Sequence, residues 1–258
     1  SIYMIKNLDI VSDLGEGFGS YQIADDDSLL QIVSSANIAC GFHAGDPRTM
    51  ASTVQKCIAN NVAIGAHPSF PDRVGFGRRG MDLSALEVET DMLYQIGALN
   101  GFAQAFGTKL QHVTPHGKLG NYVVEDSKYA NAVAEAIAKF DDSLIIVTLP
   151  GELAEAAKKK GLRIAYTIFA DRAYNTDGSL VSRNQPGAVL HDIDLITSRV
   201  LRMVNEGKVT SITGQDITVK GSSLLLHGDT AGSVQMATKI RDSLIANGII
   251  IKSLNATK

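Results

Sequence analysis

The sequence predicts an α/β fold, a single (βα) barrel of about seven parallel strands. Short apolar segments of strand length alternate with segments in which apolar residues recur at helical spacing, and short loops join them. This alternation is typical of parallel strands joined by right-handed crossovers. Nearly every apolar segment also ends in a polar motif. An open sheet gathers such motifs at a few strand ends, so their wide distribution favours a barrel.

The first half of the chain alternates expected strands with expected helices. The apolar segments of strand length are residues 3–11, 36–40, 61–66 and 109–114. Three acidic residues at 25–27 indicate a helix start, and residues 49–59 are expected to form a short helix. Ser84 and Glu87 form the capping box of a longer helix. Residues 69–81 are expected to form a long irregular loop.

The second half continues the alternation. Strands are expected at residues 143–149, 162–169 and 223–226, and helices at 128–140, 152–160, 193–206 and in a segment that ends at Asn247. The remaining segments are a loop or small hairpin at 174–191, short β structure at 209–219 and a tail at 249–254. Since no linker or change in composition interrupts this pattern, residues 1–258 are expected to form one domain.

Composition excludes several classes of protein. Apolar residues make up 45% of the chain and charged residues 20%, which is typical of a globular protein. The net charge of -3 and the absence of Trp argue against binding to nucleic acid or to a membrane surface. Cys40 and Cys57 form no CxxC pair, which indicates a reducing compartment. No apolar segment resembles a signal peptide or a membrane span, so we expect a cytoplasmic protein.

Histidines occupy the same place in four of the expected strand–loop units. Each follows an apolar segment directly and lies beside Gly or Pro; the four are His43, His67, His116 and His227. In a barrel these side chains would converge with Asp13 at the carboxyl-terminal mouth. Of the other two histidines, His112 lies within an expected strand and His191 precedes a helix start.

These residues allow two kinds of chemistry. A divalent metal held by Asp13, His43 and His67 would activate water for hydrolysis. Alternatively, Asp13 and Glu16, which flank a glycine turn, would divide the roles of base and acid without a metal. The sequence contains no short-spaced ligand pair, which favours the second interpretation.

Several arginines are candidates for binding an anion. The segment at 75–80 matches GxGxxG, but no strand leads into it and no helix begins in it, which excludes a dinucleotide site. Its arginines suggest instead a clamp for a carboxylate or phosphate. Two interpretations are open for Asp171, Arg172 and Arg183: they have a similar role, or they form an ion-pair network on the surface. Asp46 and Asp229 are either site residues or helix caps.

Seven motifs in this order resemble the LamB/YcsF (lactam-utilisation) family. They are DLGEGFGS (13–20), SANIACGFHAGDP (35–47), GAHPSFPDRVGFGRR (65–79), PHGKLGN (115–121), FADRAYNTDGSLVSR (169–183), GAVLHD (187–192) and HGDTAGSV (227–234). The resemblance implies a barrel like that of the glycoside hydrolase/deacetylase superfamily. It also implies the A subunit of a three-component, ATP-dependent 5-oxoprolinase, which converts 5-oxo-L-proline to L-glutamate with ATP and Mg²⁺ as co-substrate and needs two partner subunits.

The resemblance also implies two sets of site residues. The catalytic set comprises Asp13, Glu16, His43, His67 and His116. The substrate-binding set comprises Asp46, Arg73, Arg78, Arg79, Lys118, Asn121, Asp171, Arg172, His227 and Asp229. Two other functions remain open: a metal-dependent deacetylase or hydrolase of another small amide or sugar, and a subunit that binds a small molecule without catalysis.

The sequence departs from the family pattern at three positions. Val11 stands where the family has Asn, Thr114 where it has a basic residue, and Ala231 where it has Pro. Lys118 is expected to restore the charge that is missing at Thr114.

Overall fold

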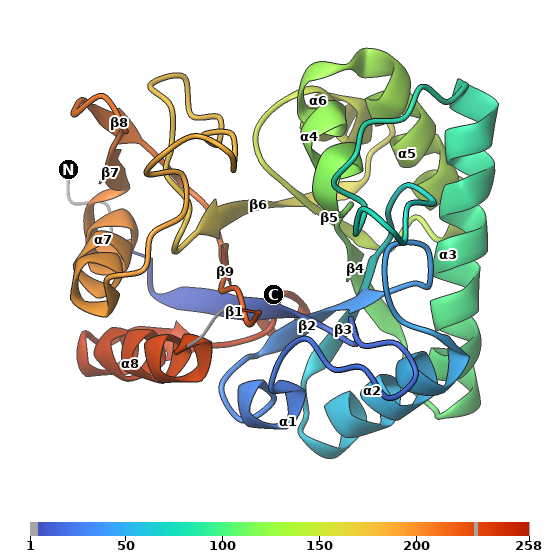
Figure 1. Cartoon of the computed structure of the whole chain (residues 1–258), viewed down its shortest axis with the longest axis horizontal. Coiled ribbons are helices and arrows are strands. Elements are labelled where there is room, and N and C mark those ends of the chain that lie inside the picture. Colours follow the sequence, from blue (N-terminus) through green and yellow to red (C-terminus); the bar gives the residue numbers. More distant parts are fainter. Residues whose placement is uncertain (1–4, 230–231, 258) are drawn as a thin grey trace.

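The computed structural model describes residues 5–229 and 232–257; the first residues of the expected first strand and Ala231 lie outside them. Seven parallel strands of the described chain form a closed barrel (Figure 1). In ring order they are β1 (Asn7–Leu14), β2 (Ser35–Ala39), β3 (Ala63–His67), β4 (Leu110–Val113), β5 (Ile145–Thr148), β6 (Arg163–Phe169) and β9 (Ser223–Leu225). Strand β9 pairs with both β6 and β1, which closes the ring and confirms the predicted barrel.

Helices surround the barrel in the predicted alternation (Figure 1). They are α1 (Asp26–Leu29), α2 (Pro47–Ala59), α3 (Ala85–Ala105), α4 (Gly117–Glu125), α5 (Ser127–Phe140), α6 (Glu152–Lys159), α7 (Ile193–Glu206) and α8 (Ser233–Ala246), and a short 3-10 helix covers Leu254–Thr257. The Ser84 side chain accepts from the Glu87 amide, and Glu87 accepts from the Ser84 amide, as the capping box predicts. The Asp46 side chain caps α2 by accepting from the Thr49 amide, with Pro47 at the first position of the helix.

Three short strands lie outside the ring. β7 (Lys208–Thr210) and β8 (Asp216–Thr218) form an antiparallel pair, as expected for residues 209–219. β10 (Ile250–Ile251) pairs with the start of β1. Within the described chain, no helix is long and apolar enough to cross a membrane.

Helix α4 was not predicted, because Gly117 and Gly120 are poor helix formers. Leu119 and Val123, four residues apart, bury one face of α4, and this burial outweighs the low propensity. Both glycines are required by close packing: a Cβ on Gly117 would lie 2.4 Å from the Gly77 carbonyl oxygen, and one on Gly120 would lie 2.8 Å from that of Pro115.

Strand β1 also differs from its prediction, since it extends to Leu14 rather than ending at Val11. The polar residues Ser12 and Asp13 are therefore part of the strand, where Ser12 donates to the Leu226 carbonyl oxygen. Asp13 gains a fixed position in the barrel wall, opposite Asn37 of β2.

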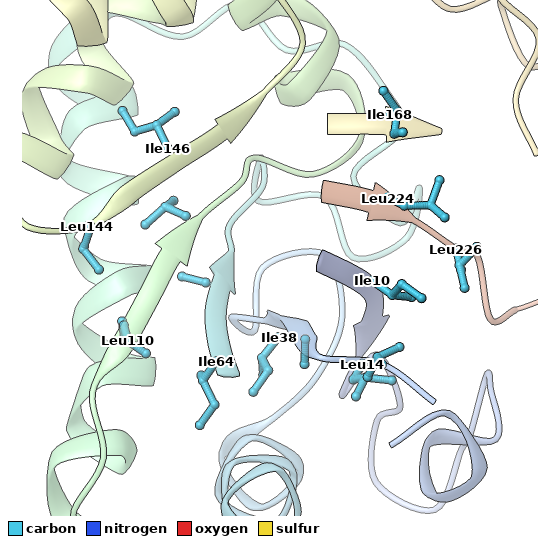
Figure 2. Packing of buried hydrophobic residues seen from close by; sticks show 14 of the residues in the cluster. Ile10, Leu14, Ile38, Ile64, Leu110, Leu144, Ile146, Ile168, Leu224 and Leu226 are labelled. Carbon is cyan, nitrogen blue, oxygen red and sulfur yellow. The ribbon is translucent and has the colours of Figure 1, made fainter. Parts of the chain in front are cut away.

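Apolar side chains of the strands pack against the surrounding helices. Figure 2 shows Ile10, Ile38, Ile64 and Ile146 radiating outward from the ring of strands, and all four are buried. Successive side chains of a strand alternate between its two faces, so the intervening positions face the barrel interior. Those positions include the polar residues Asp9, Asp13 and Asn37 on β1 and β2, and the apolar residues Ile145 and Val147 on β5. The interior is therefore polar on the side of β1 and β2 and apolar on the side of β5.

Candidate active site

Five of the predicted residues meet at the carboxyl-terminal mouth of the barrel. Asp13 lies near the end of β1 and His67 ends β3. His116 precedes α4, directly beyond β4, while Glu16 and His43 lie in the loops after β1 and β2. We call these five residues the mouth cluster. Three strand ends and two short loops hold its members, so the barrel itself fixes their spacing.

Two histidines of the mouth cluster face each other. His67 Nε2 lies 3.0 Å from His116 Nδ1. The remote ring nitrogens contact backbone carbonyls: His67 Nδ1 lies 2.8 Å from the oxygen of Thr114, and His116 Nε2 lies 2.8 Å from that of Phe76. Since a carbonyl oxygen only accepts, both remote nitrogens carry hydrogen and both facing nitrogens are free to bind a cation.

The carboxylates lie beside this pair. Asp13 Oδ1 is 3.4 Å from His67 Nε2, and Glu16 Oε2 is 4.0 Å from His116 Nδ1. Four residues could bind one metal ion together: Asp13, Glu16, His67 and His116. One potential ligand atom from each lies within 4.8 Å of those from the other three. His43, which the sequence suggested as a metal ligand, is not in this group. Its Nε2 lies 2.7 Å from Glu16 Oε2 instead.

Aromatic packing covers one side of the cluster. The His43 and His116 rings stack at 3.6 Å between centroids with an interplanar angle of 11°. Phe76 packs edge-on against both rings, at 5.1 Å from each. The loop at 69–81 thus covers the histidines, and the Phe76 carbonyl that orients His116 comes from a residue with φ of 54°. This use of the glycine-rich segment replaces the dinucleotide role that its pattern resembles.

Burial and neighbouring charges shift the pKa values of the two carboxyl groups in opposite directions. Burial raises the pKa of Glu16 well above its usual range, and the charge of Asp13 raises it further. Burial acts on Asp13 in the same direction, but the charge of His67 and its hydrogen bond lower the pKa of Asp13 below its usual range. The cluster therefore contains one carboxylate that stays ionised and one whose affinity for a proton is increased.

The pKa values of the three imidazoles also shift in different directions. Burial lowers the pKa of His43 well below its ordinary value and that of His116 to about 3, with a further decrease from a neighbouring histidine in each case. Burial also acts to lower the pKa of His67, but the charge of Asp13 outweighs it and the net shift is upward. His43 and His116 are consequently neutral at physiological pH, and His67, beside Asp13, has the greatest affinity for a proton of the three imidazoles.

A second row of polar residues supports Asp13 from inside the barrel. Asn37 Nδ2 donates to Asp13 Oδ1 at 3.1 Å, and His112 Nε2 donates to Asn37 Oδ1 at 2.7 Å. The His112 ring crosses β3 over Gly65, where a Cβ would lie 2.1 Å from His112 Nε2. Asn37 is not among the site residues predicted from the sequence, and His112 is predicted there only as part of a strand. A polar residue inside an apolar strand was the available signal for both.

The hydrogen bonds continue from His112 to the other end of β1. Gln111 Nε2 lies 3.0 Å from His112 Nδ1 and donates to Ser35 Oγ, and Ser35 donates to Asp9. Asp9 also accepts from Ser34 and Ser223. Burial raises the pKa of Asp9, although these hydroxyl groups act in the opposite direction. We call the series from Asp9 to Asp13 the polar chain.

The predicted anion-binding arginines divide into two groups. Arg73 donates to the carbonyl oxygens of Gly41 and Gly45, and Arg79 forms an ion pair with Asp72. These two side chains hold loops in place. Arg78 contacts Asp229 at 3.8 Å and lies over the Phe76 ring at 5.1 Å, which brings its guanidinium next to the mouth cluster.

The other predicted substrate-binding residues do not form one group. His227 Nδ1 is 2.6 Å from Asp171 Oδ1, and Arg183 lies 3.4 Å from the other ring nitrogen of His227. Arg172 is buried and donates to the Val181 carbonyl. Asp46 accepts from the amides of Gly19 and Thr49 as well as capping α2. Lys118 and Asn121 lie on α4, where Lys118 is 5.9 Å from the centre of the Tyr122 ring.

A cavity of about 820 Å³ opens beside the cluster. Asp13 and Glu16 form part of its wall, together with residues from α1, α2 and the start of α8. The lining contains six carboxylate residues, Asp13, Glu16, Asp25, Asp26, Asp27 and Asp229, and one lysine, Lys56. A molecule of small-metabolite size can therefore reach the cluster from a strongly acidic cavity.

A closed (βα) barrel with buried carboxylates and imidazoles at its strand ends defines an enzyme of the barrel class. The model of the LamB/YcsF family matches residues 8–258, and the chain belongs to this family. The A subunit of 5-oxoprolinase from Alkaliphilus metalliredigens is 48% identical over 250 residues, which cover 96% of this chain and 98% of that protein. Its counterpart from Campylobacter jejuni is 50% identical over 248 residues, with coverage of 96% and 97%.

Solved structures agree with this assignment. A lactam utilization protein from Thermus thermophilus superposes with a TM-score of 0.91 at 41% identity, covering 96% of this chain and 100% of that one. A peptidoglycan N-acetylglucosamine deacetylase gives a TM-score of 0.50 at 14% identity, covering 98% and 88% of the two chains, which shows a shared fold alone.

Proposed function

We propose that this chain is the A subunit of an ATP-dependent 5-oxoprolinase, which opens 5-oxo-L-proline to L-glutamate together with two partner subunits. The observation that carries the proposal is identity of about half of the residues, over nearly the whole chain, to proteins named as the A subunit of 5-oxoprolinase. The mouth cluster supplies the buried acid–base groups that such a reaction needs. We place the complex in the cytoplasm, because Cys40 and Cys57 are both free thiols.

The substrate explains why ATP is needed. A five-membered lactam is an unreactive amide, and transfer of a phosphoryl group to its oxygen makes the carbonyl carbon electrophilic. Water then adds to this carbon and the ring C–N bond breaks, which leaves the phosphoryl group on the new carboxyl group. A second water hydrolyses this acyl phosphate and releases phosphate. In balance, 5-oxoproline, ATP and two waters yield glutamate, ADP and phosphate.

Glu16 is the best candidate for activating the water. Its raised pKa suits a group that accepts a proton near neutral pH. His43 fixes the orientation of Glu16 through the contact at 2.7 Å. A cation held between the facing nitrogens of His67 and His116, beside ionised Asp13, would stabilise negative charge that develops on the lactam oxygen.

The substrate carboxylate requires a cation near the cluster. Arg78 fits this role, because its guanidinium lies over Phe76 and its contact with Asp229 at 3.8 Å is loose. Arg183, 3.4 Å from His227, adds positive charge nearby, and Lys118 at the start of α4 is a further candidate. Arg73 and Arg79 are better understood as loop supports, since each is already bound to carbonyl oxygens or to Asp72.

ATP with Mg²⁺ is the proposed co-substrate of the complex. Six carboxylate residues line the cavity beside the cluster, and they would repel a bare triphosphate. We therefore assign the nucleotide to the complex as a whole rather than to this cavity.

The test is reconstitution. The chain would be co-purified with the two partner subunits encoded in its own genome, and glutamate release from 5-oxo-L-proline would be measured with each component omitted in turn. Glutamate that forms only when the chain, both partners and ATP are present supports the proposal. No glutamate from a folded, assembled complex would refute it, and release from another lactam or an acetylated sugar would redirect it.

A further inference from the structure

The geometry points to a divalent transition-metal site formed by Asp13, His67 and His116, with Glu16 at its edge. The inference does not rest on the proposed lactam activity, because metal binding is a property of this chain alone. It rests on the tautomers of two buried histidines, on three distances between potential ligand atoms and on the hydrogen bonds that orient the ligands.

The tautomers make both facing nitrogens acceptors. Each neutral imidazole carries one hydrogen on one of its two nitrogens. In His67 it is on Nδ1, which donates to the Thr114 carbonyl oxygen, and in His116 it is on Nε2, which donates to the Phe76 carbonyl oxygen. Two lone pairs then face each other across 3.0 Å between His67 Nε2 and His116 Nδ1. This contact is repulsive unless a cation, either a proton or a metal ion, lies within reach of both.

The distances favour a metal ion over a proton. A proton on His67 Nε2 would account for the 3.0 Å contact with His116 Nδ1, but its charge-assisted hydrogen bond to Asp13 would normally be about 2.7–2.9 Å long. The observed distance to Asp13 Oδ1 is 3.4 Å. Atoms bound to one zinc-like ion at about 2.0–2.2 Å are separated by about 3.0–3.4 Å. The 3.0 Å and 3.4 Å separations both fit this spacing.

The surroundings of the three ligands also fit a metal. Metal-bound histidines typically donate their remote N–H to a carbonyl or carboxylate, as His67 and His116 do. The Asp13 carboxylate is held by Asn37 at 3.1 Å, and Asn37 is held in turn by His112. Since two ligands project from β1 and β3 and the third lies directly beyond β4, at the start of α4, the barrel holds them in position before the ion binds.

The donor set defines the class of ion. Two imidazoles and one carboxylate suit zinc, manganese, cobalt or iron, whereas Mg²⁺ and Ca²⁺ prefer oxygen ligands throughout. Three protein ligands leave a coordination position open, as in catalytic sites. Glu16 lies 4.0 Å from His116 Nδ1 and is hydrogen-bonded to His43, so we place it beside that position rather than among the ligands.

The experiment uses the purified full chain and Co²⁺ as a spectroscopic probe. The chain would be stripped with a chelator, dialysed and titrated with Co²⁺ while visible absorption is recorded, and Zn²⁺ content would be measured after dialysis. We expect one equivalent of metal, ligand-field bands from Co²⁺ and a higher Tm with Zn²⁺. Failure to bind stoichiometric Zn²⁺, Mn²⁺ or Co²⁺ would overturn the inference, whatever the result of the 5-oxoprolinase assay.

Matched variants locate the site. Asp13→Asn, His67→Gln and His116→Gln are each expected to weaken Co²⁺ binding at least 100-fold, roughly the upper end of losses seen when only a supporting residue is removed. His227→Gln is the control, because His227 is also a histidine paired with a carboxylate at a strand end. Binding that is lost in the control but retained in His67→Gln would refute the assignment.

A measurement on the wild-type chain covers the case in which a variant does not fold. With ¹⁵N-labelled histidine, Zn²⁺ is expected to shift the resonances of His67 Nε2 and His116 Nδ1 and to leave the remote nitrogens protonated. A His67 ring that keeps hydrogen on both nitrogens in the presence of Zn²⁺ would show that a proton, not a metal, separates the two histidines.

Discussion

Replacing Gly65 by alanine is expected to damage the site from inside the barrel. Gly65 does not have a positive φ, so the backbone itself accepts alanine. The new Cβ would lie 2.1–2.3 Å from Nε2, Cε1 and Cδ2 of His112. The ring would have to move, which would break its 2.7 Å hydrogen bond to Asn37 and leave the support of Asp13 incomplete.

The cost has two parts. Overfilling a packed interior costs about 1–3 kcal/mol. Leaving Asn37 and His112 without their buried hydrogen bond costs a further ~1–3 kcal/mol. We therefore expect Gly65→Ala to lower the free energy of unfolding by about 2–6 kcal/mol.

Urea unfolding of five proteins, the wild type, the three single variants Gly65→Ala, Gly101→Ala and His112→Ala, and the double variant Gly65→Ala/His112→Ala, tests this reasoning. Gly101→Ala is the control, because Gly101 lies in α3 with no atom within 4 Å of the position that a Cβ would take, and alanine there should stabilise the helix by ~1 kcal/mol. In a His112→Ala background the added methyl has space, so Gly65→Ala should cost less than about 0.5 kcal/mol. An equal cost in both backgrounds, or none in the wild type, would refute the steric argument.

Three further predictions concern individual side chains. Glu16→Gln should lower kcat of the reconstituted complex about 10²–10⁴-fold and leave the Co²⁺ spectrum of the chain unchanged; loss of the spectrum would make Glu16 a ligand. Asp9→Asn should flatten the pH dependence of stability. Because the folded-state pKa of Asp9 is raised, unfolding releases a proton, and wild-type stability falls as pH rises from about 4 towards that pKa. Parallel stability curves for the two proteins in urea would contradict this. Lys118→Ala should impair turnover while changing the free energy of unfolding by less than ~1 kcal/mol, since its ring contact is long; unchanged kinetics would exclude a role for Lys118.

The sequence predicted the barrel and most of the mouth cluster because both depend on local patterns. Apolar segments followed by Gly, Pro and His identify strand ends, and in a parallel barrel all strand ends meet at one mouth. His43, His67 and His116 could therefore be placed together without knowing their contacts. The capping box at Ser84 and the cap at Asp46 are also local, and both are present in the structure.

The parts that sequence did not reveal depend on contacts between distant residues. The bond between His112 and Asn37 joins β4 to β2 across β3, and it needs a glycine at position 65. The pairing of Arg79 with Asp72 depends on the path of an irregular loop. The sequence suggested His43 as a possible metal ligand beside His67, whereas the structure places His116 there. Which histidine lies beside His67 depends on side-chain directions, and strand boundaries do not determine these.

The polar chain also means that substitutions are tolerated differently outside and inside the ring of strands. Apolar residues outside the ring, such as Ile38 and Ile64, can be exchanged for others of similar volume at modest cost. Asp9, Gln111 and His112 have no such freedom, because hydrogen bonds link them through Ser35 and the last one holds Asn37. Drift or redesign of this protein should therefore concentrate on its outer shell, while residues at the bottom of the barrel remain tied to the requirements of a reaction at the top.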